Sequence, residues 1–149
     1  MDARIRSRQD LQDYLDHFNG KRYEQQIAYY APDVIYKVGA LTLTEPQQIA
    51  DFYAEFHQYS REFVKIGQFA LDGDVCACTM PSHFEPFRDY VMNGLSFKAG
   101  DIIDIVSFIF YTLKDGKIWR IRVARYPGPP SDFKELTGHD RPEGFFTAT

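Results

Sequence analysis

Three side chains of this chain have the chemistry of proton transfer. His83 ends a strand-like segment, and an imidazole with an ordinary pKa of about 6.5 gives and takes protons near neutral pH. Tyr14 falls on the apolar face of an expected helix, where its phenol could donate to a carbonyl or enolate oxygen. Asp104 is the lone charge in the apolar segment 102–113, where a carboxylate needs a partner or a role. These three are the catalytic candidates.

Structural interpretations of the same residues stay open. His83 could be a surface histidine in the segment 81–86, and Tyr14 could be a core tyrosine bonded to a backbone carbonyl. Further pocket candidates lie on the expected inner faces or near the cavity mouth: Ser107, Tyr111, Tyr36, Tyr53, His57 and Arg125. Val38 and Met80 complete the set expected to contact substrate.

Several kinds of chemistry are disfavoured by what the sequence lacks. No Ser–His–Asp order, glycine-rich phosphate loop or metal-ligand spacing is visible, so neither a metal nor a cofactor is expected. Cys76 and Cys78 leave the same face of one expected strand and are taken as buried free thiols, with His83 the one potential zinc ligand nearby. Glu85 and Asp33 could act as bases only if the loop ends fold inward.

Hydrophobic periodicity predicts three helices, all in the N-terminal half. The first, 7–19, has Ser7 as N-cap and an Asn-Gly pair for a left-handed end, and its apolar stripe consists of Leu11, Tyr14, Leu15 and Phe18. The second, about 22–30, stops at Ala-Pro-Asp. The third is capped by Thr44, has proline in its first turn and runs to about Tyr59, and its apolar stripe is Ile49, Phe52, Tyr53 and Phe56.

Alternating and apolar runs predict strands in the rest of the chain. They cover 34–38, an extended segment at 41–43, 62–71, 75–83, 102–113 and 118–126. Asp-Gly pairs at 72–73 and 115–116 predict hairpin turns. The stretch 85–100 is either a loop or a frayed strand extension.

This element order predicts an α+β fold: a cone-shaped, curved, mixed or antiparallel sheet with three helices packed on its concave face. One domain spans 1–126, and a Pro- and Gly-rich tail, 127–149, wraps the surface or frays, with one helical turn at about 131–136. The cavity between helices and sheet is the expected ligand site. Because the strand 102–113 is apolar on both faces, its convex side needs a cover, and we expect a homodimer through the sheet.

Composition excludes several partners. The chain has 149 residues, enough for one self-sufficient core, and 44% of them are hydrophobic. A formal charge of −4 leaves no basic excess for nucleic acid. With no membrane-length apolar run and a polar start, a cytoplasmic location is expected. The high aromatic share, 16%, indicates either ring-packed interfaces or a pocket for a flat apolar ligand.

Three segments, 14–19, 28–34 and 110–118, together form the diffuse pattern F-N … A-P-D-V … D-G-K-I, each segment contributing one part of it in this order. With the helix at 47–59, they extend over about 11–126. In these segments the chain resembles the SnoaL-like, nuclear-transport-factor-two-like superfamily. The superfamily includes polyketide cyclases, scytalone dehydratase, ketosteroid isomerase and limonene epoxide hydrolase, as well as members without catalysis. The resemblance implies the cone-shaped, cystatin-like fold and leaves the activity open.

The resemblance transfers some catalytic positions and not others. Tyr14 matches the oxyanion-stabilising tyrosine of ketosteroid isomerase, but that enzyme's general base falls at Val38, as does a pocket tyrosine of scytalone dehydratase. The second catalytic acid of ketosteroid isomerase falls near Phe108 or Ile109, which are apolar. The isomerase arrangement is therefore not reproduced.

Other transferred positions fall on two strands. His83 lies close to the strand histidine of scytalone dehydratase and the SnoaL-type cyclases, and Ser107 falls at an asparagine of the dehydratase. The resemblance places the Ser107 face inside, so Asp104 would point outward and could pair with Arg120 or Arg122. With the opposite parity, Asp104 becomes the general base.

The best-supported interpretation is a cofactor-independent acid/base enzyme, an isomerase, cyclase or dehydratase, acting on a small apolar, polyketide-like or aromatic metabolite of a biosynthetic pathway. In it His83 is the general acid/base, Tyr14 polarises the carbonyl, and Ser107 or Tyr111 orients the substrate. The missing carboxylate at Val38 favours the alternative, a non-catalytic ligand-binding or dimeric assembly module.

Epoxide hydrolysis ranks last. It would need Asp104 to meet Arg120 or Arg125 inside the cavity, and their expected parities oppose this.

Overall fold

The computed structural model describes residues 2–92 and 95–140. Its helices are α1 (Arg8–Asn19), α2 (Tyr23–Ile27), α3 (Pro46–Phe56) and α4 (Phe133–Thr137), with a short 3-10 turn, η1 (Pro130–Asp132). Its strands are β1 (Tyr30–Val38), β2 (Leu41–Leu43), β3 (Ser60–Val64), β4 (Phe69–Asp72), β5 (Val75–Pro86), β6 (Tyr90–Met92), β7 (Leu95–Phe97), β8 (Ile103–Lys114) and β9 (Lys117–Arg125).

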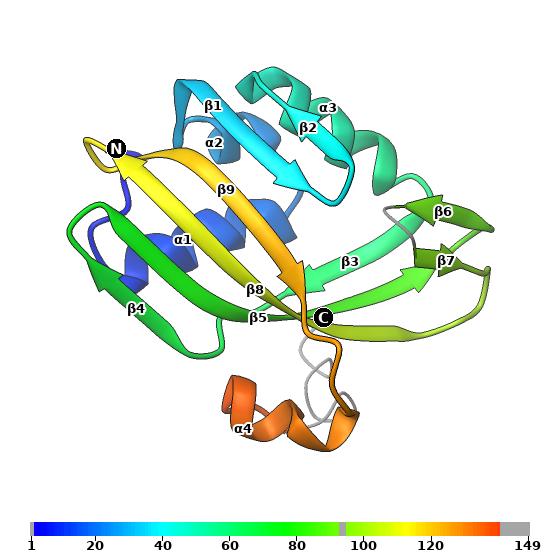
Figure 1. The fold of residues 1–149 in the computed structure, drawn as a ribbon. Coiled ribbons are helices and arrows are strands. Elements are labelled where there is room, and N and C mark those ends of the chain that lie inside the picture. The colour runs from blue at the N-terminus through cyan, green and yellow to red at the C-terminus, as the bar shows by residue number, and fades with distance from the viewer. Residues whose placement is uncertain (1, 93–94, 141–149) are drawn as a thin grey trace.

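The described residues form one curled sheet of seven strands and a separate sheet of two strands, β6 and β7. The order across the sheet is β2-β1-β9-β8-β5-β3, and β4 pairs with β5 (Figure 1). All pairs are antiparallel except β1 with β9. The predicted α+β fold with a curved mixed sheet is confirmed. Within the described ranges, no helix has the length and apolar character needed to cross a membrane.

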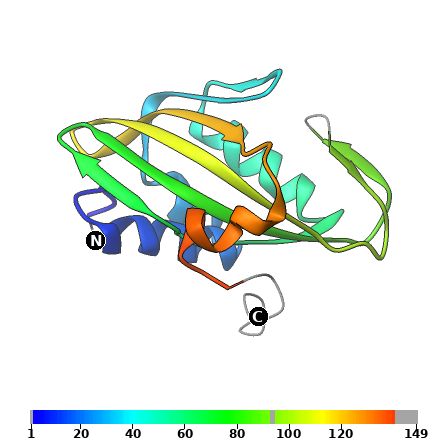
Figure 2. The same cartoon turned by 60° about the horizontal axis from the view of Figure 1, so that its bottom comes forward.

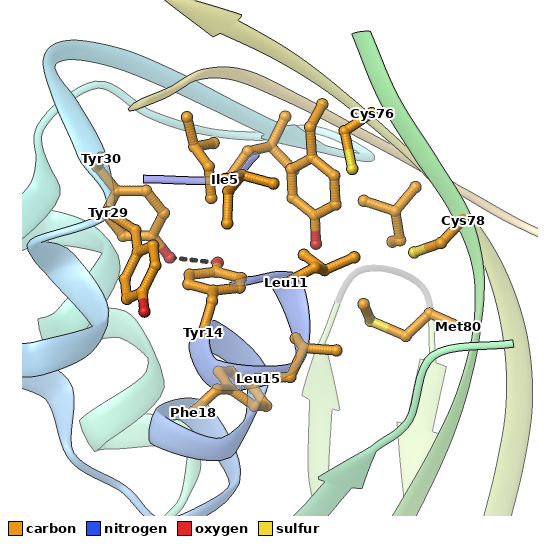
Figure 3. Close-up of a cluster of buried hydrophobic side chains, with 14 of the residues drawn as sticks. Ile5, Leu11, Tyr14, Leu15, Phe18, Tyr29, Tyr30, Cys76, Cys78 and Met80 are labelled. Atoms are coloured by element: carbon orange, nitrogen blue, oxygen red, sulfur yellow. Dashed lines mark hydrogen bonds between the residues drawn. The ribbon is translucent and has the colours of Figure 1, made fainter. Parts of the chain in front are cut away.

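The first helix packs its apolar stripe into the main core. Ser7 accepts from the Asp10 backbone N–H at 3.1 Å, so the predicted N-cap is confirmed. The stripe is buried against β5 and β8: Leu11, Tyr14, Leu15 and Phe18 (Figure 3). The predicted left-handed end is shifted, because Gly20 has φ −83° and Lys21 takes the positive φ of 57°.

The second and third helices are shorter than predicted. The second covers only Tyr23–Ile27, because β1 already begins at Tyr30, which pairs with Ile118 of β9. The third ends at Phe56, and Thr44 does not cap it. Instead, the Thr44 backbone N–H donates to the Gln48 side chain at 2.9 Å.

The predicted strand 62–71 is divided into β3 and β4. Between them, Gly67 runs so close to β5 that an added Cβ would lie 2.3 Å from Thr79 Oγ1. Its N–H still donates to the Thr79 carbonyl at 2.7 Å, so the segment follows β5 without regular pairing. The stretch 85–100, expected to be a loop or a frayed strand extension, contributes the end of β5 and then β6 and β7, which Phe97 anchors against Phe56 and Phe84; residues 93–94 lie outside the described part of the chain.

The two predicted Asp-Gly turns are confirmed, since Gly73 (φ 58°) and Gly116 (φ 77°) take the left-handed conformation. The convex face, opposite the helices α1 and α3, is only partly covered by the chain itself. There α4 packs Phe133 on Val106, in line with the helical turn expected at 131–136, and Figure 2 shows α4 crossing β5. Phe108 and Phe110 remain 40% and 45% exposed on β8.

Candidate active site

A cavity of about 680 Å³ lies between α1, α3 and the concave face of the sheet. Its walls are mostly apolar, with polar side chains at Tyr14, Tyr36, Tyr53, Glu62, Ser82, Tyr90, Ser107, Tyr111 and Arg125. Among the described lining residues, Glu62 and Arg125 are the only charged ones. An apolar pocket with a few polar groups is typical of a small-molecule site.

The acidic group of the cavity is the Glu62 carboxylate, which buried His57 holds in place. Alternation along β3 puts Glu62 and Val64 on the cavity side. Glu62 Oε1 lies 3.0 Å from His57 Nε2, and His57 Nδ1 lies 2.6 Å from the Tyr23 hydroxyl. With neutral His57 both bonds are satisfied when Tyr23 donates to Nδ1 and the Nε2–H donates to Glu62. These three residues form the Tyr23–His57–Glu62 chain.

Burial raises the pKa of the Glu62 carboxyl, and the hydrogen bond and electrostatic attraction of the His57 ring offset only part of that rise. The Glu62 side chain is 9% exposed and that of His57 3%. A carboxyl group with a raised pKa exchanges protons closer to neutral pH than an ordinary glutamate does. Glu62 is therefore suited to act as a general base or acid toward a ligand in the cavity.

Two phenols from facing elements meet in the same cavity. Tyr36 of β1 and Tyr53 of α3 place their hydroxyl oxygens 2.5 Å apart. Burial raises the pKa of both phenols, and the charge of Glu62 raises them further. Both hydroxyls therefore stay protonated, and because one donates to the other, the second O–H remains available as a donor to a ligand oxygen.

Tyr14 lines the cavity at the end of a second chain of hydrogen bonds. Gln26 Nε2 donates to the Tyr30 hydroxyl at 2.8 Å, and the Tyr30 and Tyr14 hydroxyls lie 2.7 Å apart (Figure 3). When Tyr30 accepts from Gln26 and donates to Tyr14, the Tyr14 proton is free to point toward a ligand. Burial raises the pKa of Tyr14 well above its usual value, so it is a neutral donor.

Eight of the eleven predicted site residues line this cavity: Tyr14, Tyr36, Val38, Tyr53, Met80, Ser107, Tyr111 and Arg125. His57 stands behind Glu62 and reaches the site through it. Within the described residues, no cluster of three or more side chains could hold a metal ion.

The expectation that His83 borders the cavity is wrong. On β5, Ser82 and Phe84 line the cavity, so alternation turns His83 to the convex face. There His83 is 4% exposed, with Nδ1 2.8 Å from Asp104 and Nε2 3.0 Å from Glu85. The geometry does not support a catalytic role in the cavity for His83 or Asp104.

The outward direction expected for Asp104 is confirmed, with His83 as its partner. Arg120 also points away from the cavity, where it donates to the Asp33 carbonyl and stacks on Trp119. Asp104 and Arg120 thus lie outside the cavity, contrary to what epoxide hydrolysis by these residues requires.

Sequence reasoning missed Glu62, which it treated only as the start of a strand. A weak signal existed, because Glu62 has the same parity as Val64 in an alternating segment. Its partner His57 lies five residues earlier, at the end of α3, and only the turn between α3 and β3 brings them together.

The chain belongs to the SnoaL-like domain family, whose model matches residues 11–121. No curated protein matches the sequence significantly.

Solved structures share the fold. A protein from Pseudomonas putida KT2440, proposed to be a polyketide cyclase, superimposes with a TM-score of 0.67 at 18% identity over 85% of this chain and 94% of that one. A protein from Kribbella flavida, proposed to be a ketosteroid isomerase, gives 0.59 at 19% identity over 90% and 89%. An epoxide hydrolase of Mycobacterium tuberculosis gives 0.62 at 16% identity over 85% of each chain. Identities this low establish a common fold and no particular activity.

Proposed function

We propose that this protein is a cofactor-independent enzyme that moves a proton on a small apolar metabolite bound in the cavity. The observation that supports it is the Glu62 carboxylate, which faces an otherwise apolar cavity while His57 fixes its orientation. A buried acid is costly and contributes little to a binding site for apolar molecules. Isomerases, cyclases and dehydratases of this kind share one first step, the removal of a proton next to a carbonyl.

In that step the Glu62 carboxylate takes the proton from carbon, and the C–H electron pair moves into the carbonyl to form an enolate. Burial raises the pKa of Glu62 and so strengthens it as a base, and His57 holds the reacting oxygens in place. Protonated Glu62 then returns the proton to a different carbon in an isomerisation, or to a departing hydroxyl in a dehydration. In a cyclisation the enolate carbon instead attacks a second carbonyl of the same molecule, the π electron pair of that carbonyl moves onto its oxygen, and protonated Glu62 gives the oxygen its proton.

The enolate oxygen needs hydrogen-bond donors that are in place before the reaction. The Tyr36–Tyr53 pair supplies one such donor, and it lies close enough to Glu62 for the charge of that residue to raise the pKa of both phenols. Tyr14 supplies another from α1. Fixed donors in a site shielded from water contribute about 10²- to 10³-fold to the rate of such reactions.

The test needs no knowledge of the natural substrate. The compound 2-tetralone has acidic protons next to its carbonyl, and their exchange in D₂O is followed by proton NMR. We expect the wild-type protein to accelerate exchange, and Glu62→Gln to remove about 10²-fold or more of that acceleration. Glu55→Gln, an exposed glutamate on α3, is the matched control and should exchange like wild type.

A different result would favour the alternative, a ligand-binding module. If 2-tetralone shifts cavity resonances without exchanging faster than in buffer, the cavity binds without catalysis. If exchange is fast and Glu62→Gln leaves it unchanged, Glu62 is not the base.

We further propose that two copies associate through the convex face. The support is the pair Phe108 and Phe110, 40% and 45% exposed beside a shallow apolar hollow of about 470 Å³ that α4 leaves open. A second copy would cover these rings, which a monomer would leave in water.

A further inference from the structure

A second feature of the same cavity, an arginine at one end, indicates the chemical class of the ligand, an inference that rests on the proposed function. Arg125, the last residue of β9, is the one cationic side chain among the described residues that line the cavity. Its guanidinium forms no hydrogen bond or ion pair with any described residue. By contrast, Arg120 donates to backbone carbonyls and stacks on Trp119, and Arg61 pairs with Glu85.

A hydroxyl group lies beside this arginine. Ser107 of β8 is the direct cross-strand partner of Arg125, and both side chains line the cavity. Ser107 is buried, 6% exposed, and its hydroxyl likewise has no hydrogen-bond partner among the described residues. A cation and a hydroxyl that face the same space from neighbouring strands can bind one anionic group together.

The other charge of the cavity is far from this pair. Arg125 on β9 lies opposite Ser107 on β8, which in turn lies opposite Met80 on β5. Glu62 on β3 lies opposite Phe84, which is four residues after Met80 on β5. Glu62 is therefore three strands across and four residues along the sheet from Arg125. In a flat sheet this would separate the two Cα atoms by about 20 Å, and the curl shortens it. An anionic group is attracted to Arg125 and repelled by Glu62, so a ligand with one anionic end has a preferred direction in the cavity.

We propose that Arg125 and Ser107 form a carboxylate-binding subsite at one end of the cavity, so that the ligand is an apolar organic acid. Its carboxylate lies on the Arg125 guanidinium and the Ser107 hydroxyl, and its apolar body extends toward Glu62 and the tyrosines. The planar fork of arginine matches the two oxygens of a carboxylate. The acid group is a handle for binding, and the proton transfer takes place at the other end.

The test compares 2-naphthoate with its uncharged isostere 2-naphthamide by isothermal titration calorimetry at neutral pH and low salt. Wild type should bind the acid more tightly than the amide. Arg125→Met, which keeps the unbranched stem, should weaken binding of the acid about tenfold and leave the amide within about twofold. Arg125→Lys should fall between, because it keeps the charge without the fork.

Arg122→Met is the matched control, since Arg122 lies on the same strand but on the convex face. It should bind both compounds like wild type. Added salt should reduce the preference for the acid in wild type and have little effect in Arg125→Met.

The proposal is overturned if wild type does not prefer the acid, or if Arg125→Met changes both affinities equally or neither. The proposed function is read separately, because 2-tetralone has no anionic group and its exchange depends on Glu62. If Glu62→Gln loses exchange but wild type does not prefer the acid, the proposed enzyme activity stands and the carboxylate-binding subsite is rejected. An acid preference without exchange would retain the subsite and reject the enzyme.

Discussion

Replacing Glu62 by glutamine should make the protein more stable and less active at neutral pH. Burial raises the folded-state pKa of this carboxyl, with His57 offsetting part of the rise. Below the ordinary value of 4.5 the group is protonated in both states and costs nothing. As the pH rises through the folded-state pKa, the folded chain must hold a buried charge, and stability is lost.

Glutamine does not titrate and can still accept from the His57 Nε2–H. The stability gain of Glu62→Gln at neutral pH is about 1.4 kcal/mol for each unit by which folding raises the pKa. For a chain of this length, each kcal/mol raises the thermal midpoint by about 3 °C. The gain should disappear in acid, where wild type is protonated as well.

The assay is thermal unfolding, followed by circular dichroism, of wild type, Glu62→Gln and the exposed control Glu55→Gln from acid to neutral pH. The expected signature is a pH-dependent gain for Glu62→Gln alone, with loss of 2-tetralone exchange. In wild type, exchange should rise with pH as Glu62 loses its proton. A Glu62→Gln protein that is less stable than wild type at neutral pH would show that His57 fully compensates the burial of the Glu62 charge. That result would refute the interpretation that burial raises the pKa of Glu62 and makes it a base.

Four further outcomes test the rest of the description. Replacing both phenols of the Tyr36–Tyr53 pair by phenylalanine removes the hydrogen-bond donor that the pair supplies and should slow 2-tetralone exchange by about 10²-fold, with 2-tetralone affinity measured by NMR titration little changed. Phe110→Glu should convert a dimer into a monomer in sedimentation equilibrium, and a monomeric wild type would contradict the proposed association. His83→Gln should lower the unfolding midpoint and leave exchange within about twofold of wild type, whereas a large loss of exchange would return His83 to the site. Leu11→Ala, at a fully buried position, should cost about 2–5 kcal/mol of unfolding free energy in urea titrations.

Local patterns were enough to predict much of this fold. The stripe of α1, its Ser7 cap and the turns at Gly73 and Gly116 depend on residues close together in sequence. The inward parity of Ser107 and Tyr111 followed from alternation along one strand, once the resemblance had placed one face inside. Helix ends were less certain, because pairing partners such as Ile118 for Tyr30 lie far away in the chain.

The amino-acid sequence by itself determined the class of fold, the apolar and phenolic character of the pocket and eight of the side chains that line it. Tertiary structure alone decided which acid lies inside. Parity is a local property, but which parity faces the cavity depends on how strands pair, and the pairing of β5 with β8 puts His83 beside Asp104 on the outer face. The curl of the sheet likewise turns Glu62 into the cavity and places it against His57. Burial there raises the pKa of Glu62, an effect that arises only when the surrounding chain excludes water.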